Sequence, residues 1–260
     1  WIAEIIALPV FAIAFTQYLG YFVRLEPWQD ILIKGVFLFG ITTINIVGVK
    51  AAGKVNDVLT LLKLSPLVLF IFVGFYFVIS EPDAVIQNYT PLAPLGFANF
   101  GVAIVLVFWA YAGFEIGTLP ASEIKEPKRT IPRAITVGIL IVLVFYLSTN
   151  FILFGVANWT DLAKTKIPLV HASTLMMGSV GAFIIGIGAL ISVSGSNESG
   201  TLGTSRLSYA MAIHGLLPKF FSKTHPKFKT PYIALIIQGT VAFVLSSFAG
   251  ITSLISFAVF

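Results

Sequence analysis

A lysine lies within one of the most apolar stretches of the chain, where an ionisable side chain is costly. Asn56, Thr60 and Lys63 occupy positions i, i+4 and i+7, so they share one face of a helix. An ionisable group inside a membrane span is a functional hypothesis by default, and burial favours the uncharged form of a lysine. Lys63 is therefore a candidate proton carrier or a substitute for a coupling cation. The structural alternative is a lysine that extends to the inner membrane surface.

Small and polar residues interrupt another apolar run, 99–121. The stretch Ala110–Gly113 combines small residues with a glycine and is followed two positions later by Glu115. A helix that breaks there exposes backbone groups that can hold the charged groups of a ligand, whereas a glycine kink is the simpler alternative. Trp109 and Tyr111 beside the predicted break are expected to form the wall or gate of a cavity rather than membrane-interface aromatics.

The apolar run 178–203 carries a polar cluster that cannot face lipid. Its members are Ser192, Ser194, Gly195, Ser196, Asn197, Glu198, Ser199 and Gly200. Close helix packing explains the serines and glycines, but Asn197 and Glu198 need partners or water. Glu4, in the first apolar run, is a further acidic candidate, with a position near the membrane surface as its alternative.

Composition assigns the chain to the all-α membrane proteins. Of its 260 residues 57% are hydrophobic and 10% charged, and the mean hydropathy is +0.97. A chain in lipid must satisfy its own backbone hydrogen bonds, which favours helices. The net charge of +5 falls in short loops, which indicates membrane topology rather than nucleic-acid binding. There are no cysteines, and His171, His214 and His225 lack metal-ligand spacing, so neither a metal nor a cofactor is predicted.

Spans of about 20 apolar residues define the expected elements. The runs are 1–22, 31–49, 56–79, 99–121, 133–157, 178–203 and 232–249, with 251–260 beginning an eighth. Eleven basic residues fall on one side, which is therefore cytoplasmic, and Arg24, Lys34, Lys164 and Lys166 fall on the other. Residues 158–177 are expected to form a long outer loop, and the inner loop 205–231 to carry a short helix that stops at Gly215. Both ends lie within apolar runs, so we interpret residues 1–260 as one incomplete transmembrane domain.

Three stretches resemble the amino acid–polyamine–organocation (APC) superfamily. Phe108–Ile135, "FWAYAGFEIGTLPASEIKEPKRTIPRAI", is similar to that family's sixth helix and the loop after it. Gly203–Phe221, "GTSRLSYAMAIHGLLPKFF", resembles the loop after the eighth helix, and Ile44–Leu64, "INIVGVKAAGKVNDVLTLLKL", the junction of the fourth and fifth helices. The resemblance covers essentially the whole chain, from the third helix to the start of the tenth.

The resemblance implies a five-plus-five inverted-repeat fold with a discontinuous sixth helix, in the cell membrane. By that reading the substrate amino group binds the free carbonyls of Ala110, Tyr111, Ala112, Gly113 and Phe114, and Trp109 forms the inner wall or gate. Glu4 and Gly200 line the substrate site. Lys63 matches the fifth-helix lysine that replaces a sodium ion in proton-coupled members, with Ser192 or Ser194 beside it. Glu115 matches a sixth-helix glutamate implicated in pH response, and Glu198 is a further proton-coupling candidate.

The departures from the family pattern limit what the resemblance implies. The first helix, which holds the substrate carboxylate, is not within residues 1–260, and many members have Asn where Glu198 stands. The expected function is proton-coupled symport of a broad or neutral amino acid by alternating access, and the partners are that amino acid, a proton and the bilayer. Exchange remains the main alternative, and a transporter-derived sensor is a minor one. A heptahelical receptor does not fit, because the first span of a receptor runs inward, whereas the first run of this chain is predicted to run outward. An enzyme does not fit either, because no catalytic constellation of residues lies in a span. The oligomeric state stays open.

Overall fold

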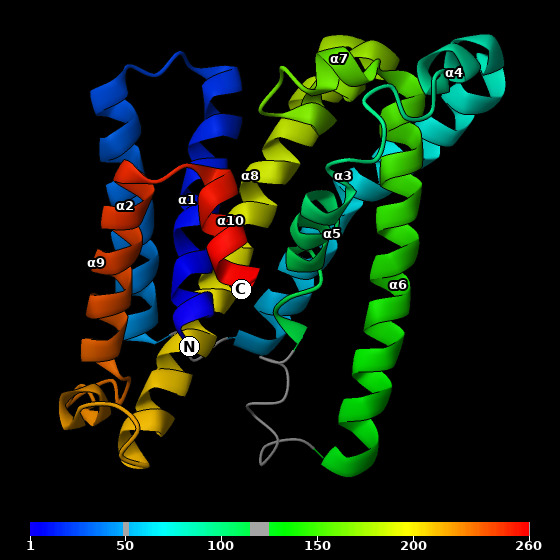
Figure 1. The fold of residues 1–260 in the computed structure, drawn as a ribbon. Coiled ribbons are helices and arrows are strands. Elements are labelled where there is room, and N and C mark those ends of the chain that lie inside the picture. Colours follow the sequence, from blue (N-terminus) through cyan, green and yellow to red (C-terminus); the bar gives the residue numbers. More distant parts are fainter. Residues whose placement is uncertain (49–51, 115–124, 260) are drawn as a thin grey trace. The chain divides into compact units, whose positions relative to one another are not determined.

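The residues that the structure describes form helices joined by links, with no strand among them. The computed structural model describes residues 1–48, 52–114 and 125–259, with the backbone alone at 52–61 (Figure 1). Its helices are α1 Ile2–Phe22, α2 Pro27–Val47, α3 Ala52–Ser80, α4 Pro82–Tyr89, α5 Phe100–Trp109, α6 Pro127–Val156, α7 Trp159–Leu162, α8 Pro168–Ile213, α9 Tyr232–Phe248 and α10 Ile251–Val259, with a 3₁₀ turn at Lys219–Ser222. These helices confirm the all-α membrane class.

Five helical segments in the described part of the chain are long and apolar enough to cross a membrane. They are Ile2–Phe22, Pro27–Val47, Leu62–Ser80, Pro127–Val156 and Pro168–Ile213. The apolar helices α5 and α9 are shorter. The protein is therefore a multi-pass integral membrane protein.

The helices α2 and α6 begin earlier than their apolar runs predict, as do α3 and α8. We expected spans from 31 and from 133, but α2 begins at Pro27 and α6 at Pro127. Glu26 and Gln29 form a capping box at the start of α2, in which the Glu26 N–H donates to Gln29 Oε1 at 2.9 Å. Hydropathy overlooks such polar first turns, although proline at the first helical position and a capping box are helix-start signals.

The largest correction concerns α8. The predicted outer loop 158–177 contains α7 and the first part of α8, and the short helix predicted after residue 205 is the end of α8 itself. Gly178 interrupts α8 with φ 66° and ψ −156°, which is where the apolar run starts. The predicted stop at Gly215 is confirmed: Gly215 has φ 77°, and the N–H groups of Gly215 and Leu216 donate to Ala212 O and Met211 O. These bonds form a Schellman motif.

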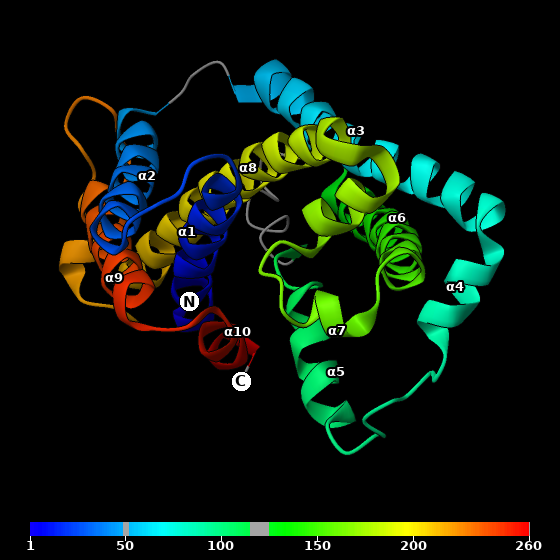
Figure 2. The ribbon, with the colours of Figure 1, turned by 90° about the horizontal axis from the view of Figure 1, so that it is seen from above.

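The chain divides into two compact units. Unit 1 comprises residues 1–56, 103–123 and 193–260, and unit 2 comprises 57–102 and 124–192. In unit 1, α1 packs against α2, α9 and α10, and α2 packs against α9 (Figure 2). Leu8, Ala12, Leu38 and Ala242 form a buried cluster among these helices.

Close approaches hold unit 2 together. A Cβ atom at Gly74 of α3 would overlap the side chain of Ile152 in α6 at 2.3 Å, and one at Gly188 of α8 would overlap Pro66 of α3 at 2.4 Å. Glycine at these positions therefore permits the helices to pack at these distances, as small residues do between membrane helices.

The helix α4 caps the end of α6 in unit 2. Asn88 Nδ2 donates to Gly155 O and the Tyr89 hydroxyl donates to Phe151 O, each at 2.8 Å. Gly155 O belongs to the last turn of α6, where carbonyls lack an intrahelical donor. The Tyr89 ring stacks on Phe151, and burial raises the pKa of the Tyr89 phenol above its ordinary value. The neutral phenol therefore remains a hydrogen-bond donor above neutral pH.

Lys34, which we expected on the outer side of the membrane, is a buried residue of a candidate span. It lies within α2 and is 8% exposed. Its Nζ lies 2.6 Å from Asp30 Oδ2 and 3.3 Å from Ser246 O, a carbonyl in the last turn of α9. A cation is favoured at a helix C-terminus. Lys34 thus joins α2 to the end of α9 and has a structural partner on each helix.

Candidate functional site

The helix α5 ends at the predicted break. After Trp109 the backbone changes to i→i−3 hydrogen bonds: Ala110 N donates to Val107 O at 3.0 Å, and Ala112 N donates to Trp109 O at 3.1 Å. Gly113 follows with φ 103°. The first half of the predicted discontinuous helix thus stops inside its apolar run. The predicted proton-coupling residue Glu115 and the predicted second half of this helix lie outside the described residues.

Gly113→Ala is expected to destabilise the protein by about 1–3 kcal/mol, because a residue with a Cβ rarely adopts φ 103°. Steric overlap is not the cause, since no atom of the described residues lies within 4 Å of a Cβ built at Gly113. Gly101→Ala is the matched control: its Cβ also meets nothing within 4 Å, but it lies in helix α5, where alanine is favoured. Melting curves in detergent compare the two variants, and equal melting midpoints would contradict the prediction.

Trp109 packs against α1 within unit 1. Its ring centroid lies 5.9 Å from that of Phe11, with the planes tilted by 40°. It also borders a buried cluster formed by Val10, Ile13 and Leu254. The side chain is half-buried. The predicted wall residue is thus held on one side by α1, at the point where α5 ends.

One face of α1 approaches two other predicted parts of the site. Glu4, Leu8 and Phe11 occupy positions i, i+4 and i+7 and therefore share this face. Phe11 contacts Trp109. A Cβ at Gly200 of α8 would lie 3.3 Å from Leu8 Cδ2. The structure therefore brings Trp109 and Gly200 to the α1 face that carries Glu4, all within unit 1.

A buried polar network joins α1, α8 and α9 beside this face. Asn197 is fully buried; its Nδ2 donates to Leu8 O at 3.3 Å, and its Oδ1 accepts from Thr201 Oγ1 at 3.0 Å. Gln238 Nε2 of α9 donates to Thr201 O at 2.7 Å. The expectation that Asn197 needs partners is confirmed, whereas Gln238, within the apolar run 232–249, was missed. The polar amide of Gln238 within this apolar run was the signal that could have identified it.

Asn197→Ala is expected to lower stability by about 1–3 kcal/mol, because it removes two buried hydrogen bonds and leaves a cavity between helices. Ser199→Ala is the matched control, since Ser199 is exposed on the same helix. The measurement is the melting midpoint of each variant in detergent. An Asn197→Ala midpoint equal to that of Ser199→Ala would show that this network does not stabilise the scaffold.

The predicted proton-coupling residues divide between the two units. Lys63 of α3 and Ser192 of α8 belong to unit 2, while Ser194 and Glu198 of α8 belong to unit 1. All four side chains are half-buried. The backbone is helical from Ala52 through Lys63, as the shared face of Asn56, Thr60 and Lys63 requires. Their roles stay predictions.

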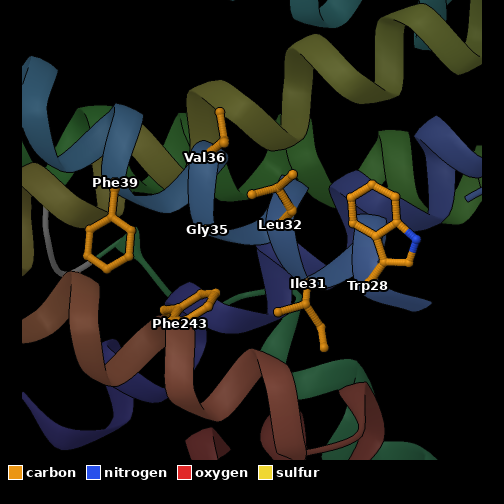
Figure 3. A pocket seen from close by; sticks show the side chains of 7 residues that line it. All are labelled: Trp28, Ile31, Leu32, Gly35, Val36, Phe39 and Phe243. Atoms are coloured by element: carbon orange, nitrogen blue, oxygen red, sulfur yellow. The ribbon is translucent and has the colours of Figure 1, made fainter. Parts of the chain in front are cut away.

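An apolar groove in unit 1 does not fit an amino acid. It lies on α2 and α9 and has a volume of about 700 Å³. Trp28, Ile31, Leu32, Gly35, Val36, Phe39 and Phe243 line it (Figure 3). An ammonium or carboxylate group loses its hydration in such surroundings without gaining a polar partner. The candidate substrate site is therefore the region around the end of α5 and not this groove.

The family of this chain follows from its similarity to known sequences. The sequence profile of the amino acid permease family matches residues 1–260. The chain belongs to this family. The permease family, together with the helical fold, confirms the resemblance to the APC superfamily.

Three bacterial relatives illustrate the range of the family, all from Bacillus subtilis strain 168. The branched-chain amino acid permease BcaP is 32% identical over 82% of this chain and 44% of its own length. The methylthioribose transporter is 31% identical over 84% of this chain and 46% of its own. The serine/threonine exchanger SteT is 30% identical over 94% of this chain and 56% of its own. The permease chain thus spans about half the length of these curated relatives.

Proposed function

We propose that this permease is a secondary active transporter that moves an amino acid together with a proton by alternating access. The observation that carries the proposal is the end of α5 at Trp109, inside an apolar run and against α1. A helix C-terminus carries partial negative charge and attracts cations. The end of α5 is therefore suited to the ammonium group of an amino acid, which the carbonyls of residues 110–114 would accept.

The side chains around the end of α5 would complete the amino-acid site. Trp109 would stack on the substrate as a wall or gate. Glu4 on the α1 face and Gly200 against that face would line the region that holds the substrate side chain. Branched-chain amino acids, serine and threonine, named for two of the relatives, carry no side-chain charge. The names of these two relatives therefore favour a neutral amino acid as the substrate of this permease.

The proton would be carried by groups within the spans. Lys63 would alternate between charged and neutral forms, with Ser192 or Ser194 beside it and Glu115 and Glu198 as further acidic groups. The contact between Trp109 and Phe11 would rearrange when the sixth helix moves against the scaffold that includes α1. Such rocking of one helical bundle against another is the general mechanism of transporters with inverted repeats. The substrate would leave chemically unchanged, so no enzymatic step is proposed.

Exchange is the second candidate function, because one relative is named an exchanger. The deciding experiment is uptake of labelled leucine, serine and arginine into proteoliposomes that contain the full-length protein. Uptake driven by an inward proton gradient into empty vesicles would support symport. Uptake that requires internal amino acid and ignores the gradient would support exchange. No uptake of any amino acid under either condition would refute the proposed substrate class.

A further inference from the structure

The link between α8 and α9 carries basic side chains that have no acidic neighbours in sequence. Lys219, Lys223, Lys227 and Lys229 fall within eleven residues, and all four are exposed. The chain contains no Asp or Glu from Ser199 to Phe260. Among the ion pairs that the structure describes, none includes one of these lysines. The link therefore presents concentrated positive charge that no described ion pair compensates.

Hydrogen bonds hold part of this link in a fixed shape. His225 Nδ1 accepts the backbone N–H groups of Lys227 and Phe228, each at 3.2 Å. The Lys229 N–H donates to His225 O at 2.9 Å. Thr230 Oγ1 donates to Ile46 O in the last turn of α2 at 2.6 Å. Lys227 and Lys229 thus project from an ordered turn attached to the end of a membrane span.

Two apolar side chains are exposed on the same link. Leu216 is 71% exposed and Phe220 43% exposed. Phe220 stacks on Phe221 at 4.7 Å between ring centroids, and Phe221 is buried in the cluster with Ala212 and Ala234. Phe220 therefore covers the core on one side and faces outward on the other. Exposed apolar side chains beside lysines are typical of segments that lie in a membrane interface.

Another basic segment of the chain contains an acidic residue. The stretch 125–133 contains four basic residues but also Glu126, whose carboxylate lies 4.0 Å from Arg129. The positive-inside rule requires basic residues in cytoplasmic links, but it requires neither the lack of acids nor exposed Leu and Phe. The link between α8 and α9 follows α8 directly and leads into α9 (Figure 1). The predicted topology places this link on the cytoplasmic side of the membrane.

We propose that residues 214–231 form a binding surface for anionic phospholipids. The four lysines attract the headgroup phosphates, and Leu216 and Phe220 enter the apolar boundary below them. Clusters of this size beside a membrane helix attract anionic lipids. This surface is independent of the amino-acid site and does not depend on the proposed transport function.

The test compares two double variants of the full-length protein with matched charge changes. Lys223→Gln with Lys227→Gln removes two charges from the proposed surface. Lys164→Gln with Lys166→Gln removes two exposed lysines from the link before α8, on the opposite side of the predicted topology. Native mass spectrometry counts the phosphatidylglycerol or phosphatidylcholine bound during titration in a nonionic detergent. Melting midpoints verify that each variant is folded.

Each lysine is expected to contribute about fivefold to phosphatidylglycerol affinity, so the first double variant should bind roughly 25-fold more weakly. The second variant should bind as the wild type does, and phosphatidylcholine affinity should not change. Phosphatidylglycerol binding within twofold of wild type in the first variant would overturn the proposal. Equal losses in both variants would also overturn it. Displacement of the lipid by inorganic phosphate at constant ionic strength would show a site for free phosphate instead.

Discussion

Lys63→Ala should abolish uptake driven by a proton gradient, lowering the initial rate by at least ~100-fold, which corresponds to about 2.7 kcal/mol. The reason is that Lys63, half-buried in the span of α3, is the proposed group whose charge changes during the cycle. Alanine can neither carry the proton nor substitute for a coupling cation. The measurement is uptake of labelled amino acid into proteoliposomes with and without an inward proton gradient.

Two controls separate proton coupling from the general cost of losing a lysine. Lys63→Arg keeps a positive charge that arginine does not release, so gradient-driven uptake should be lost while binding persists. Lys34→Ala removes another lysine from a span, one that pairs with Asp30 and the end of α9. It should lower the melting midpoint. Uptake by the protein that remains folded should still depend on the proton gradient as it does in the wild type. Gradient-driven uptake by Lys63→Ala at the wild-type rate would return Lys63 to a structural role.

Trp109→Ala should lower the transport efficiency for the amino acid by about 30-fold or more, because burying an aromatic ring against a ligand contributes at least ~2 kcal/mol. Trp109→Phe should keep most of the activity, since phenylalanine still presents an aromatic face. The measurement is the concentration dependence of uptake, together with substrate binding by the purified protein in detergent.

Trp109 also packs on Phe11, so the loss must be separated from a packing defect. Phe11→Ala removes the same ring contact, 5.9 Å between centroids, but leaves the proposed wall in place. It should lower the melting midpoint about as much as Trp109→Ala and weaken substrate binding less than threefold, about 0.6 kcal/mol. Equal losses of substrate affinity in both variants would show that Trp109 only packs the interface between α1 and α5.

Several local features of this permease could be predicted because they depend on neighbouring residues alone. Gly113 follows small residues in an apolar run, and α5 ends just before them at Trp109. Gly215 stops α8 because its positive φ completes the Schellman motif. The starts of α2 and α6 were misplaced even though their signals are local. An apolar count overlooks a proline or a capping pair in a polar first turn.

Residues in the interior were predictable by type but not by partner. The cost of an unsatisfied amide in a span predicted that Asn197 would have a partner. It could not indicate that the partner is Leu8 O, 189 positions away along the chain, or that Gln238 of α9 would reach Thr201. Lys34 shows the same limit. The sequence places it near the outer end of a span, and only the packing of α2 on α9 provides the carbonyl of Ser246.

The sequence by itself determined the membrane class, the approximate spans, the end of a helix near Trp109 and the family. Each of these follows from composition, short-range backbone preference or a contiguous motif. The tertiary structure alone decided which α1 face meets Trp109 and Gly200, how α4 caps α6, and which polar groups are paired. These features depend on helices far apart in the chain packing together, and hydropathy and local spacing do not specify which faces of two helices meet.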